Sequence, residues 1–178
     1  MSDLWPFGKK RRAFTALVSD NQQRIFRFIL KQVGNRADAE ELTQEVFLAA
    51  YRGYESFRGE CLPSTWLAGI AVNIVRNFLR RNSIRRSNTI SDEVLEFLPT
   101  TGDPMTDLES RRRMESLNAA FFRLPDDSRE VLVCVAMEGL SYEQTSVLLE
   151  LPIGTVRSRL SRARERLKAE LEEANLRG

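Results

Sequence analysis

The chain has 178 residues, of which 42% are hydrophobic and 29% charged, and its 27 Lys and Arg nearly balance 25 Asp and Glu. This composition is typical of a soluble globular protein with one or two domains and excludes a disordered chain. No apolar run approaches the length of a membrane span, and the N-terminus lacks the apolar region of a signal peptide. We therefore expect a cytoplasmic protein that does not insert into a membrane.

Histidine is absent from the sequence. Its absence removes the commonest general base, the histidine-paired nucleophiles and most zinc sites. Cys61 and Cys134 have no metal-ligand spacing, which favours inert thiols, and no phosphate-binding loop or dinucleotide fingerprint occurs. We therefore expect no enzyme, cofactor or metal site.

Apolar residues recur at helical spacing in the first half of the chain and predict helices over residues 13–33, 38–54 and 64–82. Gly34 is placed to end the first of them. The second helix carries acidic residues in its first turns, where they suit the positive end of the helix dipole. We expect these helices to form a first domain over residues 10–97.

The helical pattern stops after residue 82. Residues 98–106 contain two prolines and a glycine in an acidic stretch, which predicts a flexible acidic linker. Thr106 and Glu109 have the spacing of a capping box, so we expect helix to resume there and to run to residue 123.

The C-terminal part predicts a second helical domain over residues 107–175. A helix is expected over 126–138 with Gly139 closing it, and Ser141 and Gln144 form a capping box that opens a short helix. The break "ELP" leads into a long helix with proline in its first turn. No strand run or internal repeat stands out. The fold class is therefore all-α: two small helical domains joined by a flexible acidic linker, the C-terminal one a helix-turn-helix.

The last helix concentrates positive charge in the stretch "GTVRSRLSRARERLK". In a helix-turn-helix the second helix lies in the DNA major groove, where arginine can contact phosphates or guanine. A solvated basic face would explain this helix alone, but the capped helix and the tight break before it favour DNA binding. The inward stripe is Ile153, Val156, Leu160, Ala163 and Leu167, with Arg159 pointing sideways. The residues available to DNA are Arg157, Ser158, Ser161, Arg162 and Arg164.

A second basic cluster lies at the end of the third predicted helix and comprises Arg76, Arg80, Arg81, Arg85 and Arg86. Asn73 and Asn77 stand beside it and can hydrogen-bond base edges. The alternative interpretation is that these arginines only complement the dipole at the C-terminus of the helix. The second predicted helix is acidic instead, which indicates either a solvated face or a surface for a basic protein partner.

Together these segments resemble bacterial RNA polymerase sigma factors of the extracytoplasmic-function type. The motifs "QEVF", "FRGE", "TWL", "EGLSYEQ" and "GTVRSRLSRAR" occur in the order and spacing of that family. The resemblance covers about residues 14–173 and implies a promoter-specificity subunit that binds core RNA polymerase and directs transcription initiation at −35 and −10 promoter elements. It also implies an anti-sigma protein as a partner, and a helix over 129–137 that meets the polymerase flap.

The resemblance further implies residue roles. It assigns core-polymerase binding to Asp38, Glu41, Gln44, Glu45 and Leu48. The −10 element is contacted by Asn73, Arg76, Asn77, Arg80 and Arg81, and the loop "GECLPST" captures a flipped base. Promoter DNA at −35 is contacted by Arg157, Ser158, Ser161, Arg162 and Arg164.

The sequence departs from the family pattern at four positions. Glu150 stands where the turn often has glycine, which predicts a left-handed residue and leaves the angle between the two helices open. Ser146 replaces a usual alanine and is expected to bond its hydroxyl to the preceding turn. Asn77 replaces a frequent aspartate, and Pro63 stiffens the capture loop.

Two other functions remain as alternatives. A free-standing helix-turn-helix transcriptional regulator would bind duplex DNA tightly without polymerase, whereas a sigma factor of this type should bind weakly until core polymerase separates its domains. An adaptor that makes only protein contacts would leave both arginine clusters unexplained.

Overall fold

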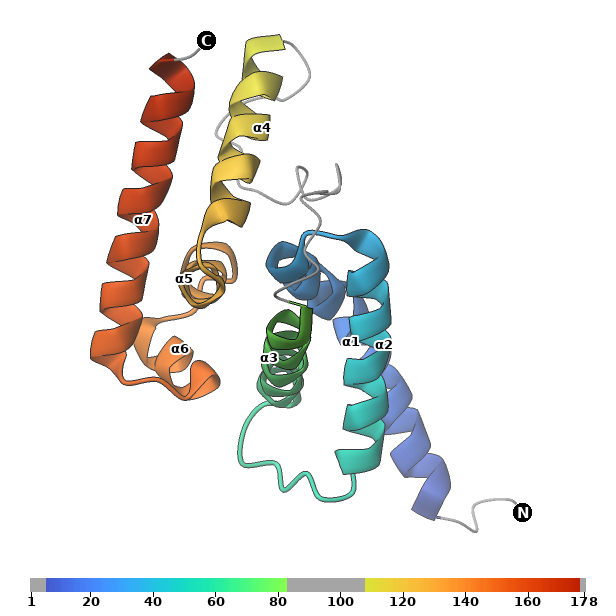
Figure 1. The fold of residues 1–178 in the computed structure, drawn as a ribbon. Coiled ribbons are helices and arrows are strands. Elements are labelled where there is room, and N and C mark those ends of the chain that lie inside the picture. Colours follow the sequence, from blue (N-terminus) through green and yellow to red (C-terminus); the bar gives the residue numbers. More distant parts are fainter. Residues whose placement is uncertain (1–5, 83–107, 177–178) are drawn as a thin grey trace.

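The computed structural model describes residues 6–82 and 108–176, and every regular element in these ranges is helical. Two groups of helices lie side by side (Figure 1). The N-terminal group contains α1 (Pro6–Val33), α2 (Arg36–Gly53) and α3 (Pro63–Asn82). The C-terminal group contains α4 (Leu108–Arg123), α5 (Asp126–Leu132), the π-helical turn η2 (Val133–Met137), α6 (Tyr142–Leu149) and α7 (Ile153–Leu176). The predicted all-helical fold class is confirmed.

The N-terminal group is a three-helix bundle held by the predicted apolar stripes. Ile29 of α1, Val46 of α2 and Leu67 of α3 are fully buried in its centre. Gly34 has φ +76° and ends α1 as expected, and the side chain of Asn35 then accepts a hydrogen bond from the Asp38 backbone to cap α2. Helix α1 begins seven residues earlier than the sequence predicts, with Pro6 at its first position, where proline is tolerated.

The C-terminal group packs α4, α5 and α6 against α7. The expected helix over 126–138 is present, but its second half is the π-helical turn η2, and Gly139 follows with φ +67°. Arg129 lies at the centre of this group with 1% of its surface exposed. It donates to the carbonyl oxygens of Phe122 and Leu124 and to Asp126, which fixes the start of α5 against the end of α4. Arg129 is therefore a buried structural residue in the segment that the resemblance assigns to the polymerase flap.

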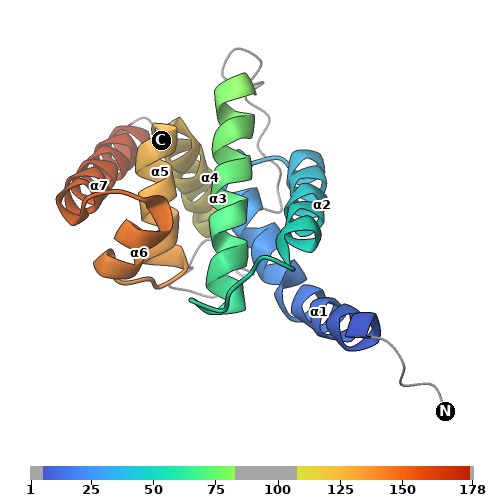
Figure 2. The ribbon, with the colours of Figure 1, turned by 90° about the horizontal axis from the view of Figure 1, so that it is seen from below.

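The two groups are in contact, and their buried residues form one continuous cluster. Helix α3 packs against α6, as the second view shows (Figure 2), and α1 packs against α5 and η2. The Phe122 ring lies so close to Gly34 that a Cβ atom there would stand 2.7 Å from it. Gly34 therefore serves both the left-handed end of α1 and this close approach.

Some of the predicted features lie outside the described ranges. These include the linker over 98–106, the arginines Arg85 and Arg86, and Thr106 of the expected capping box. The boundaries of the two domains stay predictions for the same reason.

Candidate nucleic-acid interface

The turn between α6 and α7 has the geometry of a helix-turn-helix. Ser141 and Gln144 form the predicted capping box, with Ser141 Oγ accepting from the Gln144 backbone at 3.1 Å and Gln144 Oε1 accepting from the Ser141 backbone at 2.8 Å. Glu150 ends α6 in the left-handed conformation with φ +54° and ψ +44°. The expectation that a residue other than glycine takes this position is therefore confirmed.

Two details of the turn differ from the predictions. The Ser146 hydroxyl donates to the carbonyl of Leu151 after the turn, and not to the preceding turn of its own helix. That bond ties α6 to the segment that leads into α7. Pro152 precedes α7, and its carbonyl accepts from the backbone of Thr155 and Val156 at 2.8 and 3.1 Å. The proline is thus the residue before the first turn, where its lack of an N–H costs no helical bond.

The residues predicted to form the inner stripe of α7 are buried or half-buried in the structure. Val156, Leu160 and Ala163 are buried, and Ile153 and Leu167 are half-buried. This stripe orients the opposite face toward solvent. The exposed DNA-binding candidates are Arg157, Ser161, Arg162 and Arg164, while Ser158 is half-buried.

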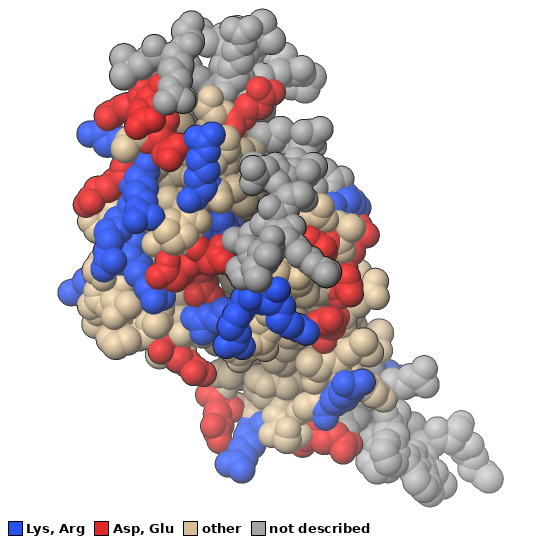
Figure 3. Space-filling view, in the orientation of Figure 1, with Lys and Arg blue, Asp and Glu red and all other residues tan. Residues whose placement is uncertain are grey.

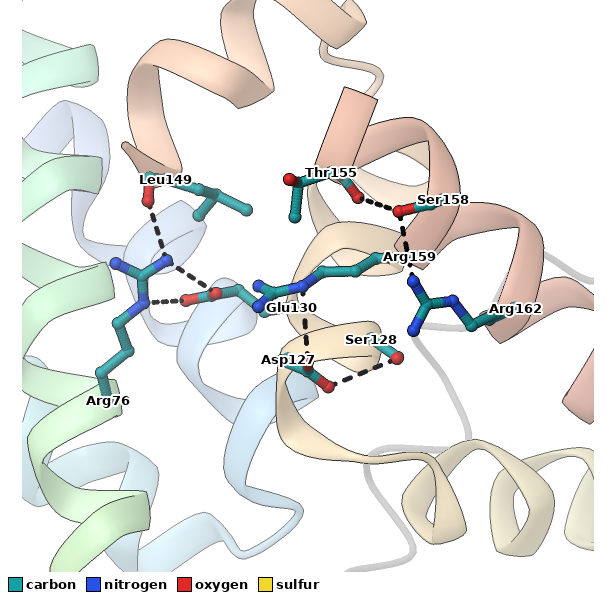
Figure 4. Close-up of polar contacts among 9 residues, drawn as sticks. All are labelled: Arg76, Asp127, Ser128, Glu130, Leu149, Thr155, Ser158, Arg159 and Arg162. Atoms are coloured by element: carbon teal, nitrogen blue, oxygen red, sulfur yellow. Dashed lines mark hydrogen bonds and ion pairs between the residues drawn. The ribbon is translucent and has the colours of Figure 1, made fainter. Parts of the chain in front are cut away.

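Neighbouring side chains hold several of these candidates in place. Ser158 Oγ donates to the Thr155 carbonyl at 3.1 Å and accepts from Arg162 Nη2 at 3.4 Å (Figure 4). The Arg157 guanidinium lies 5.9 Å from the centre of the Tyr142 ring, within cation–π range. These contacts leave both guanidinium groups at the surface, where a nucleic acid can reach them.

Arg159 is directed away from this surface. Its Nε lies 3.3 Å from Asp127 Oδ2 of α5, and its side chain is 25% exposed. Arg159 therefore joins α7 to α5, in agreement with the predicted sideways orientation.

On α3 the candidates Asn73, Asn77, Arg80 and Arg81 are exposed. Arg80 Nη2 donates to Asn77 Oδ1 at 2.6 Å, and Arg81 Nε donates to the Asn77 carbonyl at 3.3 Å. Asn77 thus organises the end of the helix, a role that an aspartate could also fill.

Arg76 differs from the other candidates on α3 because its guanidinium binds residues of the C-terminal group. Its Nε and Nη2 donate to the two carboxylate oxygens of Glu130 at 2.9 Å each, and Nη2 also donates to the Leu149 carbonyl at 3.0 Å (Figure 4). Arg76 therefore contacts α5 and the end of α6 in the C-terminal group. No local sequence pattern predicts this contact, because Glu130 lies 54 positions away in a different predicted domain.

The acidic candidates lie on the outer face of α2. Glu41, Gln44, Glu45 and Leu48 are exposed, with Leu48 56% exposed, and Tyr51 one turn further is 63% exposed. Partial burial, together with the charge of Glu41, raises the pKa of Asp38 above its ordinary value. An acidic surface with exposed apolar side chains is suited to a protein partner and not to DNA.

Positive charge gathers in two places on one face of the molecule, with acidic side chains between them (Figure 3). In the described ranges, no His, Cys, Asp and Glu residues gather in a way that could hold a metal ion. Nor does any helix there have the length and apolar character needed to span a bilayer.

Comparison with known proteins identifies this arrangement. Residues 17–84 match the family described as Sigma-70 region 2, and residues 114–167 match Sigma-70, region 4. The chain is 35% identical over 171 residues to the RNA polymerase sigma-H factor of Pseudomonas aeruginosa, covering 91% of this chain and 88% of the relative. The chain belongs to the RNA polymerase sigma factors. This family comprises non-enzymatic initiation factors that give RNA polymerase its promoter specificity.

Two further relatives and two solved structures are also similar to this chain. The sigma factor is 37% identical to HrpL of Pseudomonas syringae pv. syringae (88% of this chain, 85% of the relative). It is 33% identical to the extracytoplasmic-function sigma-E factor of Escherichia coli K12 (87% and 84%). It shares the fold of RpoE from Bartonella quintana, solved with the anti-sigma factor NepR, at TM-score 0.66, 23% identity and coverage of 90% and 98%. CnrH, solved with the cytosolic domain of CnrY, has TM-score 0.67, 24% identity and coverage of 92% and 90%. The predicted extracytoplasmic-function type is confirmed.

Proposed function

We propose that this sigma factor divides promoter recognition among three helices. Helix α7 contacts the −35 element, α3 contacts the −10 element, and α2 binds core RNA polymerase. The observation that carries the proposal is the sorting of charge by helix, with basic side chains at the surface of α7 and α3 and acidic ones on the surface of α2.

The −35 assignment is supported by the way α7 is held. Its buried stripe and the Arg159–Asp127 ion pair fix the helix against α5, so the outer face is presented without rearrangement. Arg157 and Arg162 extend from that face and have the fork of donors that matches guanine or phosphate. Ser158, Ser161 and Arg164 complete the proposed contact surface.

The −10 assignment rests on the outer face of α3. Asn73, Asn77, Arg80 and Arg81 are exposed there, and amide and guanidinium groups suit contacts with bases and with the backbone of an opening strand. Arg76 joins this surface once its contact with Glu130 is released. The loop that precedes α3 exposes Leu62, which is 70% accessible, and is the proposed capture site for an extruded base.

The polymerase assignment rests on α2. Glu41 and Glu45 supply negative charge, and Leu48 supplies apolar area, beside the half-buried Asp38 and the exposed Gln44. A carboxylate-rich surface of this kind would repel DNA and attract a basic segment of another protein. We therefore expect this surface to bind the polymerase and not the promoter.

Three further properties belong to the proposal. The structures of RpoE and CnrH were solved with protein partners, which supports an anti-sigma protein as a partner here as well. The sigma factor works in the cytoplasm, where the polymerase and the chromosome are, and it performs no chemistry itself. The helices α1–α3 and α4–α7 correspond to the two functional domains.

Run-off transcription with purified core polymerase tests the proposed function. The wild-type chain should produce transcripts that begin at defined promoters, and Glu45→Lys should lose core binding in a pull-down while it keeps its folded helicity. Glu115→Lys is the matched control, because Glu115 is an exposed acid of α4 outside the proposed surfaces. Absence of promoter-dependent initiation, or tight duplex binding without core, would instead indicate a free-standing regulator.

A further inference from the structure

Tyr142 and Arg157 meet at the surface where α6 contacts α7. The Arg157 guanidinium carbon Cζ lies 5.9 Å from the centre of the Tyr142 ring, which is within the range of a cation–π interaction. The two residues come from different helices, and α6 packs against α7 near its beginning (Figure 1). Tyr142 is not among the predicted DNA contacts, so this pairing adds a residue to the surface around α7.

The Tyr142 ring is firmly held. Tyr142 is the first residue of α6 and directly follows Ser141, whose capping box with Gln144 fixes the backbone through two hydrogen bonds. Its half-buried side chain packs against the buried cluster of the molecule. A ring anchored in this way has little freedom, and it can therefore restrict the arginine beside it.

The contact with Tyr142 leaves the hydrogen-bond donors of Arg157 available. A cation–π contact depends on the charge of the guanidinium and the face of the ring, and it needs none of the five N–H donors. Among the residues that the structure describes, no hydrogen bond or ion pair engages the Arg157 side chain. By contrast, Arg159 is paired with Asp127, and Arg162 donates to Ser158. Arg157 therefore keeps its whole fork of donors for a nucleic acid.

An acid beside Arg157 favours a base over a phosphate as its partner. Glu143 is exposed at the start of α6. Hydrogen bonds from its own backbone and from the Ser141 side chain lower the pKa of Glu143, and the charge of Arg157 lowers it further. The carboxylate is therefore ionised at neutral pH and opposes the approach of a phosphate. A guanine edge carries no net charge and accepts two hydrogen bonds from one arginine, through O6 and N7.

Restricting an arginine before it binds has two consequences. A long exposed side chain loses rotamer freedom when it binds, and a ring that already limits this freedom reduces the loss. Direction matters as well, because a bidentate contact with guanine requires both donors to lie along one base edge. A restricted Arg157 should therefore contribute more to sequence discrimination than a freely moving arginine would.

We propose that Tyr142 is a positioning residue for −35 recognition, which holds the Arg157 guanidinium in place for a bidentate contact with a guanine in the major groove. The inference rests on the proposed function and deepens it by assigning base reading to Arg157. Tyr142 acts through Arg157 and contributes the face of its ring.

Selection of −35 duplexes from a randomised pool tests this role. Full-length chain with core polymerase binds the pool, and sequencing of the bound DNA gives the base preference at each position. Arg157→Ala should remove a preference for guanine at one position. Tyr142→Leu should weaken the preference at that same position about two- to fivefold and leave the other positions unchanged, since a surface cation–π contact contributes a factor of this size. Tyr142→Phe keeps the ring and should behave as the wild type.

Two further variants separate positioning from a general loss of structure. Val147→Ala is the matched control, because Val147 is an exposed residue of the same helix outside the proposed surfaces, and it should leave every preference unchanged. Adding Tyr142→Leu to Arg157→Ala should have no further effect on the guanine preference, since the two residues act as one unit. A structural defect would weaken all sequences alike, and circular dichroism checks that each variant keeps its helices.

Three results would overturn the proposal. Tyr142→Leu could keep the full guanine preference, or Tyr142→Phe could lose as much as Tyr142→Leu, which would assign the role to the hydroxyl group. Arg157→Ala could weaken all sequences equally, which would make Arg157 a phosphate contact.

Failure of the proposed function has a different signature. If the wild-type chain with core polymerase selects no −35 sequence and gives no promoter-dependent transcript, the sigma-factor function itself is wrong. If the wild type selects a sequence and Tyr142→Leu selects the same one with equal preference, the sigma-factor function stands and Tyr142 has no positioning role.

Discussion

Helices α3 and α7 both carry arginines proposed to contact DNA, but the inward-facing arginines of the two helices have different partners. On α7 the side chains of Arg157 and Arg162 are exposed, and the arginine directed inward, Arg159, is bound within its own helix group. On α3 the inward arginine, Arg76, is bound by the opposite group. The proposed −35 side chains are therefore already exposed in this structure, whereas one of the proposed −10 side chains, Arg76, is engaged by Glu130.

The largest effect should come from removing an α7 arginine. Replacing Arg162 by alanine should weaken binding of the free chain to its −35 duplex by about 1–3 kcal/mol, because an exposed contact is lost. Arg76→Ala should leave that affinity almost unchanged, since Arg76 is engaged by Glu130. A titration of both variants against labelled duplex makes the comparison.

The same two variants should behave alike once core polymerase is present. Open-complex formation in run-off assays should then fall for Arg76→Ala as well as for Arg162→Ala. Equal losses for the two variants in the free chain would remove the distinction between the two helices.

A smaller effect is expected at the turn that presents α7. Glu150 holds a left-handed conformation that costs a residue other than glycine about 1 kcal/mol or more. Glu150→Gly should therefore raise the free energy of unfolding by about that amount, as measured by urea denaturation. A lower stability would mean that the glutamate side chain supports the turn.

The smallest effect concerns the pH dependence of the Arg76–Glu130 ion pair. The carboxylate of Glu130 is surrounded by Arg76, Arg159, Asp127 and Cys134, and burial raises its pKa above the ordinary 4.5. A raised pKa means that the folded chain binds this proton more tightly than the unfolded chain. The resulting stabilisation is full below 4.5 and is lost as the pH rises through the raised pKa.

Glu130→Gln mimics the protonated carboxyl at every pH. The wild-type free energy of unfolding should therefore decrease relative to that of Glu130→Gln as the pH rises from 4.5 toward neutrality. Parallel denaturation of the two proteins across this range makes the test. A difference that changes in the opposite sense would show that Arg76 outweighs desolvation, and a constant difference would show that the two effects cancel.

Local signals predicted most of the fold. The spacing of apolar residues predicted the helices, and the Ser141–Gln144 pair predicted the start of α6. Gly34 and Gly139 predicted two helix ends. These features depend on residues within one or two turns of each other, so a single sequence carries them. The exposure of Arg157, Arg162 and Arg164 followed from the same periodicity.

Contacts between distant segments were not predictable in this way. Arg76 and Glu130, or Lys31 and Glu138, carry no local mark that pairs them, and each is an ordinary helical charge in its own segment. Burial of Arg129 was missed for the same reason, since a charged residue in an amphipathic helix is expected at the surface. The positions of the two helix groups decide these roles.

The π-helical turn η2 fixes the rotational phase of Glu138. Eight residues of regular α-helix make about 2.2 turns, which would rotate Glu138 well away from the direction of Glu130. The turn at η2 is wider, as the bond from the Glu138 backbone to the Val133 carbonyl at 2.9 Å shows, so the same eight residues come closer to two full turns. Both acids then face α1 and α3. Deleting one residue from Val133–Met137 should restore a regular helix and leave Glu138 facing the same way, because seven residues of regular helix also make about two turns. The π-helical turn therefore adds one residue to the helix while Glu138 keeps its contact with Lys31 of α1.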